Sequence, residues 1–176
     1  MNRRSYLSLL AYVFFQSASA QEVAAPLGLE LGKATCKGAS ASVGQGAARS
    51  QSAWSGGELL TLSTQAVPEI QDLQKAYVVC NRAGAVIAVE LTLPKAKREQ
   101  TIAQLDRKYR SVQRDIPFVG SAFISWRAKN ATIDLDAPHL DFSMYLTYLA
   151  PGAKATYQAH VAAQRRALEQ KQASKL

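Results

Sequence analysis

Hydrophobic and polar residues alternate along several short stretches of the chain, and this alternation predicts strands. The clearest case is residues 85–93, where every second position is apolar: Ile87, Val89, Leu91 and Leu93. Successive side chains of a strand point to opposite faces, so the pattern predicts a strand with one buried face. Residues 75–80 are predicted to pair with it across a turn at residues 81–84.

Further strands are predicted on both sides of this pair. Three follow it, at residues 122–127, 131–136 and 140–149. In the last of these, one side is apolar (Phe142, Met144, Leu146, Tyr148) and the other carries Ser143, Tyr145 and Thr147. Before the pair, residues 51–54 and 59–63 flank Gly56 and Gly57, which is typical of a hairpin turn. Residues 27–31 form a short apolar run that predicts one more strand.

A helical period replaces the alternation in other segments. Residues 95–110 place Ile102, Leu105 and Tyr109 at spacings of three and four, which makes one apolar stripe. Residues 154–170 carry a sparser stripe of Tyr157, Val161 and Leu168. Shorter helices are predicted at residues 33–43 and at residues 65–73, with Pro68 in the first turn of the latter.

These elements together predict an α+β fold. Strands joined by short turns pair antiparallel, so we expect a single antiparallel β-sheet built from hairpins and a three-strand meander. Two to three helices are expected to pack on one face of this sheet. Residues 26–170 are predicted to form one domain, with a flexible segment at 21–25 and a flexible basic tail at 171–176.

Residues 1–20 have the three parts of a secretory signal peptide. Arg3 and Arg4 supply the positive start, residues 6–15 supply an apolar run, and Ala18-Ser19-Ala20 matches the cleavage pattern. Cleavage near Ala20-Gln21 predicts a periplasmic or secreted protein. The pair Arg3-Arg4 also resembles a twin-arginine signal, which exports folded proteins, so the export route stays open between the general and the twin-arginine systems.

Export changes the meaning of the two cysteines, Cys36 and Cys80, which are the only ones in the chain. In an oxidising compartment an isolated pair forms a disulfide, and we predict one here. The spacing does not match the C-x-x-C motif of redox enzymes. With 48% hydrophobic and 19% charged residues, the composition is that of a globular protein.

Export also changes the meaning of the positive charge. The chain has a net charge of +8, and two basic segments, residues 95–114 and 154–176, carry much of it. Outside the cytoplasm we expect no nucleic-acid partner; the counterpart would be anionic lipid, an acidic cell-wall polymer or an acidic protein. Solvated basic helix faces without any partner are the alternative interpretation. The candidate binding residues in the first segment are Lys97, Arg98, Arg107, Lys108 and Arg110.

One polar cluster could support chemistry. Asp134 and Asp136 lie on the same side of a predicted strand, and a turn could bring His139 and Asp141 beside them. Asp134, Asp136 and His139 are the candidate ligands of a divalent metal, and His139 with Asp136 and Asp141 are the candidate catalytic residues of a hydrolase. A solvated acidic strand edge is the alternative reading of the same pattern. No serine lies in a G-x-S-x-G or S-x-x-K motif, so a binding protein is favoured over an enzyme, and no cofactor is expected.

The remaining candidates are aromatic. Trp54 and Tyr145 could present rings at a protein contact, where such residues are enriched. The segment at residues 26–35, Pro-Leu-Gly-Leu-Glu-Leu-Gly-Lys-Ala-Thr, resembles the start of small exported bacterial proteins of unknown function. We therefore expect an accessory or inhibitor-like protein of the bacterial cell envelope that acts through protein–protein contact, with an envelope hydrolase and a lipid- or polymer-binding protein as alternatives.

Overall fold

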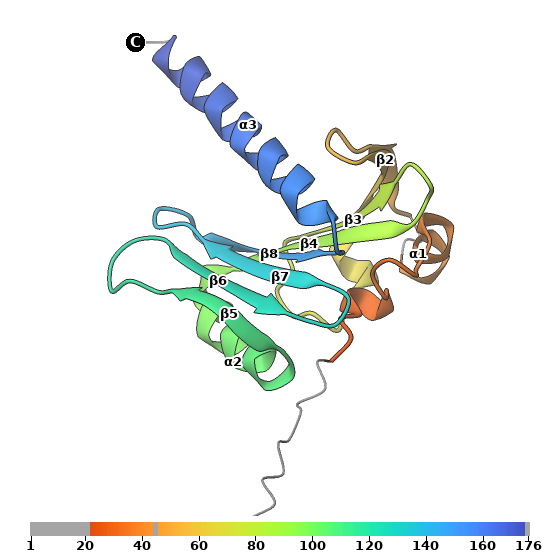
Figure 1. Ribbon diagram of the computed structural model, residues 1–176, viewed down its shortest axis with the longest axis horizontal. Coiled ribbons are helices and arrows are strands. Elements are labelled where there is room, and N and C mark those ends of the chain that lie inside the picture. Colours follow the sequence, from red (N-terminus) through yellow and green to blue (C-terminus); the bar gives the residue numbers. More distant parts are fainter. Residues whose placement is uncertain (1–21, 44–45, 175–176) are drawn as a thin grey trace, which may run out of the picture.

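The computed structural model describes residues 22–43 and 46–174, and its centre is one antiparallel sheet of eight strands. The strand order is β1-β2-β3-β4-β8-β7-β6-β5 (Figure 1). The predicted α+β class with a single antiparallel sheet is therefore confirmed. The strands are β1 (Ala48–Gln51), β2 (Gly56–Leu62), β3 (Lys75–Asn81), β4 (Val86–Pro94), β5 (Arg110–Asp115), β6 (Ala122–Arg127), β7 (Thr132–Ala137) and β8 (Ser143–Leu149).

The sheet consists of two halves with the same order of elements. Helix α1 (Cys36–Ser42) precedes the meander β1 to β4, and helix α2 (Arg98–Lys108) precedes the meander β5 to β8. The halves join where β4 pairs with β8, with Leu91 opposite Leu146 at the middle of the contact. Only the last helix, α3 (Ala153–Ala173), follows the second meander and has no counterpart inside the first half.

One face of the sheet carries the main core. Residues opposite each other in an antiparallel pair share a face, and the row Leu62, Ala76, Leu91, Leu146, Leu135 and Ile124 runs across six strands. Cys36 and Ala39 of α1 and Ile102 and Leu105 of α2 pack in the same cluster. We call this the covered face. This agrees with the expectation that two to three helices pack on one face.

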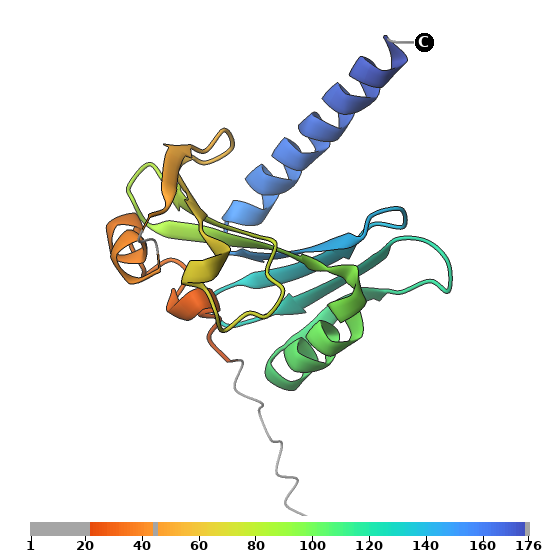
Figure 2. The same ribbon diagram turned by 180° about the vertical axis from the view of Figure 1, so that it is seen from behind.

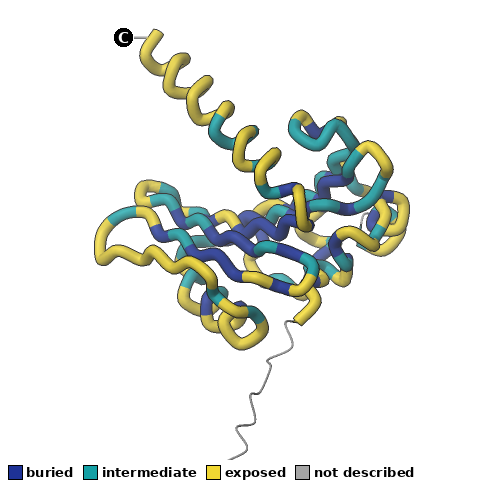
Figure 3. Tube along the Cα trace, viewed as in Figure 1, coloured by how far each residue is buried: buried dark blue, intermediate teal, exposed yellow. Residues whose placement is uncertain are grey.

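On the other face, which we call the open face, α3 is the one helix among the residues that the structure describes (Figures 1 and 2). The helix rises from the sheet at Ala153, the one residue of α3 that is buried, and its far half stands away from the body (Figure 3). Its base sits on a small apolar cluster of Val79, Ala88 and Leu149. A 21-residue helix therefore contacts the protein only through its first turns.

A disulfide links α1 to β3, as predicted. Cys36 and Cys80 are bonded, with Cα atoms 6.0 Å apart. Thr35 caps the helix by accepting a hydrogen bond from the Gly38 backbone, and it forms an isolated bridge with Ala85. The bond therefore fixes a seven-residue helix that would be marginal by itself.

Several predicted elements differ in the structure. Residues 27–31 form no strand: Pro26–Gly28 is a single 3-10 turn. Residues 65–73 contain only the 3-10 turn Thr64–Ala66. Strand β5 was not predicted, because it is an edge strand with almost no buried position and so has no apolar alternation.

The turn of the first hairpin also differs from the prediction. Gly56 and Gly57 do not form it; residues 52–55 do, and the two glycines begin β2. A Cβ atom at Gly57 would lie 2.3 Å from the Cys80 carbonyl oxygen, so close backbone contact is what requires glycine there.

The two ends of the described chain lie near Ala24 and in the last turns of α3. Ala24 is fully buried, and its backbone N–H donates to Asn130 Oδ1 at 2.7 Å. At the other end, α3 continues to Ala173, into the predicted tail. The predicted signal peptide, residues 1–20, lies outside the described residues. Within residues 22–43 and 46–174, no helix is long and apolar enough to cross a membrane.

Candidate functional site: the groove beside helix α3

The open face becomes polar away from the base of α3. One transverse row of facing residues contains Tyr77, Glu90, Thr147, Asp134 and Ser125. The next row contains Lys75, Thr92, Tyr145, Asp136 and Phe123. Three carboxylates and two tyrosines thus lie on the face of the sheet opposite the main core, the face that an antiparallel sheet can turn toward solvent.

Helix α3 stands over these rows and leaves a hollow on each side. The larger hollow, of about 530 Å³, lies against Asp134, Asp136 and Tyr145 of the sheet, with Gln158 and Arg165 of α3 as the opposite wall. The smaller one, of about 350 Å³, lies against Trp54, Tyr77 and Glu90. Tyr157 and Val161 of α3 line both hollows, and we refer to the two together as the groove.

The first turns of α3 are held by polar and aromatic contacts. Lys154 Nζ lies 3.0 Å from Asp134 Oδ2 and donates a hydrogen bond to Oδ1 at 3.1 Å. Ser125 Oγ donates to the same Oδ1 at 2.5 Å. The Tyr157 ring packs edge-on against Trp54, with centroids 5.4 Å apart. Asp134 is therefore already neutralised by a cation from the helix.

The surroundings of the Glu90 carboxylate differ from those of Asp134. It is half-buried beside Trp54 and Tyr157, and within the described chain it has no ion pair. Burial raises the pKa of this carboxyl group, and the neighbouring indole of Trp54 opposes that change only in part. A positive charge brought to Glu90 would therefore be favourable.

The carboxylate of Asp136, on the other side of the groove, has surroundings similar to those of Glu90. Burial raises the pKa of its carboxyl group, and the positive charge of Arg165 opposes this. Arg165 nevertheless lies beyond ion-pair distance, since among the described residues no cation is within 4 Å of Asp136. Phe123 and Tyr145 flank it in the same row, so this carboxylate also faces the groove beside aromatic rings.

The sequence-predicted chemical cluster is spread over this region. Asp134 and Asp136 share the open face, but His139 is exposed in the turn between β7 and β8. Asp141 binds the Tyr145 hydroxyl at 2.6 Å and the Ser143 N–H at 2.9 Å, and these hydrogen bonds lower the pKa of its carboxyl group. In the part of the chain that the structure describes, no three His, Cys, Asp or Glu side chains are arranged to hold a metal ion.

The predicted binding residues fall in two places. Trp54 and Tyr145 line the groove. The basic residues lie along α2 and the edge strand instead. Lys97 pairs with Asp72 at 3.1 Å and Arg98 with Glu99 at 2.8 Å near the start of α2, whereas the other three (Arg107, Lys108, Arg110) are at its far end.

Some groove residues were not singled out from the sequence. Glu90 has a recognisable signal, because it is the one charged residue in the largely apolar run at residues 85–93. Tyr157 belongs to the apolar stripe predicted for residues 154–170, but its place in the groove, like that of Lys154, depends on the direction in which α3 leaves β8.

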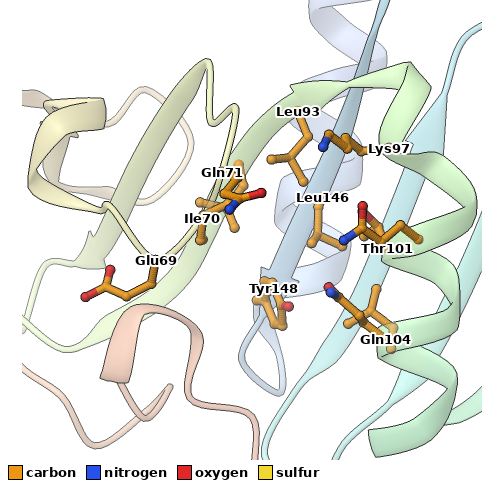
Figure 4. Close-up of a pocket in the computed structure, with 12 residues that line it drawn as sticks. Glu69, Ile70, Gln71, Leu93, Lys97, Thr101, Gln104, Leu146 and Tyr148 are labelled. Atoms are coloured by element: carbon orange, nitrogen blue, oxygen red, sulfur yellow. The ribbon is translucent and has the colours of Figure 1, made fainter.

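A second crevice of about 400 Å³ lies on the covered face, between α2 and residues 69–71 (Figure 4). Its floor is apolar, with Leu146 4% and Tyr148 9% exposed, and burial raises the pKa of the Tyr148 hydroxyl. Lys97, just before α2, and Thr101 and Gln104 of α2 form one rim, and Glu69 lines the other side. Since the floor is nearly covered by packed apolar side chains, we regard the crevice as a seam in the core.

Comparison with protein-family models, with curated proteins and with solved structures gives no match to this chain.

Proposed function

We propose that this chain is an exported accessory protein of the bacterial cell envelope that binds a segment of a protein partner in the groove beside α3. The observation that carries this proposal is the pair Glu90 and Asp136, two half-buried carboxylates without an ion-pair partner in the described chain, which face the groove beside aromatic rings. The bound segment would present Lys or Arg side chains.

The chemistry of the groove favours a cationic segment. Aliphatic parts of Lys and Arg pack against aromatic rings, and their charged ends form strong hydrogen bonds with carboxylates. Asp134 already takes such a cation from Lys154. Cationic side chains of a partner would pair with Glu90 and Asp136 in the same way. Each ion pair would remove the unfavourable free energy of an unpaired, partly desolvated carboxylate.

The position of α3 supports the same proposal. The main core lies on the other face, where α1 and α2 pack, and only the base of α3 covers the small apolar cluster on the open face. A helix that stands over a polar sheet face creates a concave surface beside it, and binding sites favour concave surfaces with a few convergent polar groups. The signal-like residues 1–20 and the disulfide support a periplasmic or secreted location.

A peptide selection tests this proposal. A random peptide library is selected against the purified chain from Gln21 onward, and affinities of the selected peptides are measured by calorimetry. We expect Lys- and Arg-containing peptides, and we expect Glu90→Gln/Asp136→Asn to weaken them at least about tenfold, since each charge-assisted contact contributes that much.

The matched control is Asp72→Asn/Glu99→Gln, which removes two acidic charges on the side of α2. It should bind the peptides as the wild type does. Equal weakening by both double variants would mean that net charge, and not the groove, attracts the peptides. Selected peptides without basic residues would contradict the proposal. A photo-reactive residue in place of Gln158 would then capture the natural partner from envelope extracts, and this adduct should disappear in Glu90→Gln/Asp136→Asn.

A further inference from the structure

Two neighbouring hairpin loops expose large apolar side chains at the same end of the sheet. Phe118 and Val119, between β5 and β6, are 105% and 67% exposed, and Leu140 and Phe142, between β7 and β8, are 91% and 92% exposed. Figures 1 and 2 show both loops projecting beyond the strands, on the left in Figure 1. We call these four residues the apolar tip. It is separate from the groove and is not used by the proposed function.

The loops that carry the apolar tip are fastened to each other and to the body. The His139 N–H of one loop donates to Ser121 Oγ of the other at 3.1 Å. The Lys95 ammonium donates to the carbonyl oxygens of Pro138, His139 and Asp141, and the Lys95 backbone N–H donates to the Phe142 carbonyl at 2.7 Å. The apolar side chains are therefore presented outward by a fixed backbone.

Basic residues lie directly beside the tip. Phe142 shares a shallow surface hollow with Lys95 and Arg98, and Lys97 lies between them in the chain. Among the described residues, Lys97 and Arg98 form solvent-accessible ion pairs with Asp72 and Glu99. Such pairs are weak and are screened by solvent, so a phosphate group can replace the carboxylate.

We propose that the apolar tip inserts into the interfacial layer of an anionic lipid bilayer, with Lys97 and Arg98 at the level of the headgroups. An exposed apolar patch marks a protein or a membrane contact, and a fluid bilayer can close around a convex tip without a matching concave surface. Apolar side chains below the headgroups and basic side chains among them are the usual arrangement of interfacial binding.

Co-sedimentation with lipid vesicles tests this proposal. The chain from Gln21 onward is used, because the apolar run at residues 6–15 would itself bind lipid. We expect binding to vesicles of phosphatidylethanolamine with phosphatidylglycerol, and at least about tenfold weaker binding for Phe118→Ser/Phe142→Ser, as expected from losing two apolar side chains. Leu168→Ser, which changes a 57% exposed leucine on α3, is the matched control and should bind as the wild type does.

The role of the basic residues is tested in the same assay. Lys97→Gln/Arg98→Gln should reduce the preference for anionic over pure phosphatidylcholine vesicles, whereas Arg107→Gln/Lys108→Gln, at the other end of α2, should keep it. A Phe142→Trp reporter should be quenched by brominated lipid, relative to the wild-type background from Trp54 and Trp126.

Three results would overturn the proposal. The first is no binding to either vesicle type, and the second is unchanged binding by Phe118→Ser/Phe142→Ser. The third is self-association that depends on the tip without any lipid binding, which would assign the surface to a second copy of the chain. The groove variant Glu90→Gln/Asp136→Asn should bind vesicles as the wild type does, so failure here and failure of the proposed function are distinguishable.

Discussion

Removal of the disulfide is the perturbation whose size follows most directly from the structure. The bond joins Cys36 to Cys80 across a sequence separation of 44 residues. In the native protein these residues are already held together, so the main effect of the bond is to restrict the unfolded chain. Closing a loop of this length corresponds to about 4 kcal/mol at room temperature.

That amount is large for this protein. A domain of this class is stable by roughly 5–15 kcal/mol, so the reduced protein would lose a substantial part of its stability. For a chain of this length each kcal/mol shifts the melting temperature by about 2–4 °C, which gives a decrease of roughly 8–16 °C. Both sulfur atoms belong to buried residues, so substitution adds a small packing cost to the effect of reduction.

Urea unfolding monitored by circular dichroism measures the effect. Wild-type protein is compared in its oxidised form, in its reduced form, and as Cys36→Ala/Cys80→Ala. The reduced protein and the double variant should unfold at similar urea concentrations, both well below the oxidised protein. If the oxidised and reduced forms had the same midpoint, the loop argument would be refuted, and an unfolded state with residual structure around α1 would be required.

Three further predictions concern individual contacts. Asp106→Asn should destabilise the protein at neutral pH by about 1–2 kcal/mol. The amide oxygen can still accept from the Trp126 indole, which lies 2.7 Å from Asp106 Oδ1, but the negative charge that strengthens this bond and pairs with Arg114 is lost. Burial raises the pKa of Asp106, but hydrogen bonds from Trp126 and Arg114 lower it overall, so the stabilisation should be present above about pH 4 and disappear in acid. Urea midpoints at several pH values measure this, and a difference between variant and wild type that is the same at every pH would contradict it. Glu90→Gln should raise the urea midpoint at pH 7 but not at pH 3, because burial raises the pKa of Glu90 and the ionised carboxylate therefore destabilises the folded state. A lower midpoint at pH 7 would instead show that the substitution had removed a stabilising contact of the carboxylate. Tyr157→Ala should lower the free energy of unfolding by about 1 kcal/mol, because the contact with Trp54 is lost. It should also speed hydrogen exchange along α3 but not along α2. Unchanged exchange in α3 would mean that Lys154 alone anchors the helix.

Most strands could be predicted from the sequence because they are half-buried. Alternation marks β4 and β8 clearly, since one face of each meets the core. It cannot mark β5, which lies at the edge with exposed side chains on both faces. The apolar run at residues 27–31 predicts a strand that does not form. Leu29 and Leu31 are buried, but they pack as part of a loop over the covered face.

The candidate site was accessible from the sequence only in pieces. The position of Asp134 and Asp136 on the same face follows from the strand period alone. Their separation from His139 cannot be predicted in this way, because the direction of a turn depends on contacts such as that between His139 and Ser121. The apolar tip also escaped prediction, since Phe142 continues the apolar pattern of β8 and is nevertheless outside the strand and exposed.

The sequence by itself determined the α+β class, most of the strands and the disulfide partners, because hydrophobic period and cysteine count are local or compositional properties. The tertiary structure decided on which face each helix lies. The sequence predicts an apolar stripe for helix α2 and a sparser one for helix α3, but it does not say on which face each stripe packs. In the structure α2 packs on the core, whereas α3 stands on the polar face and leaves a groove beside it. The physical reason is that the side of a sheet on which a helix packs depends on long-range contacts, here those of Lys154 with Asp134 and of Tyr157 with Trp54, and no local pattern encodes them.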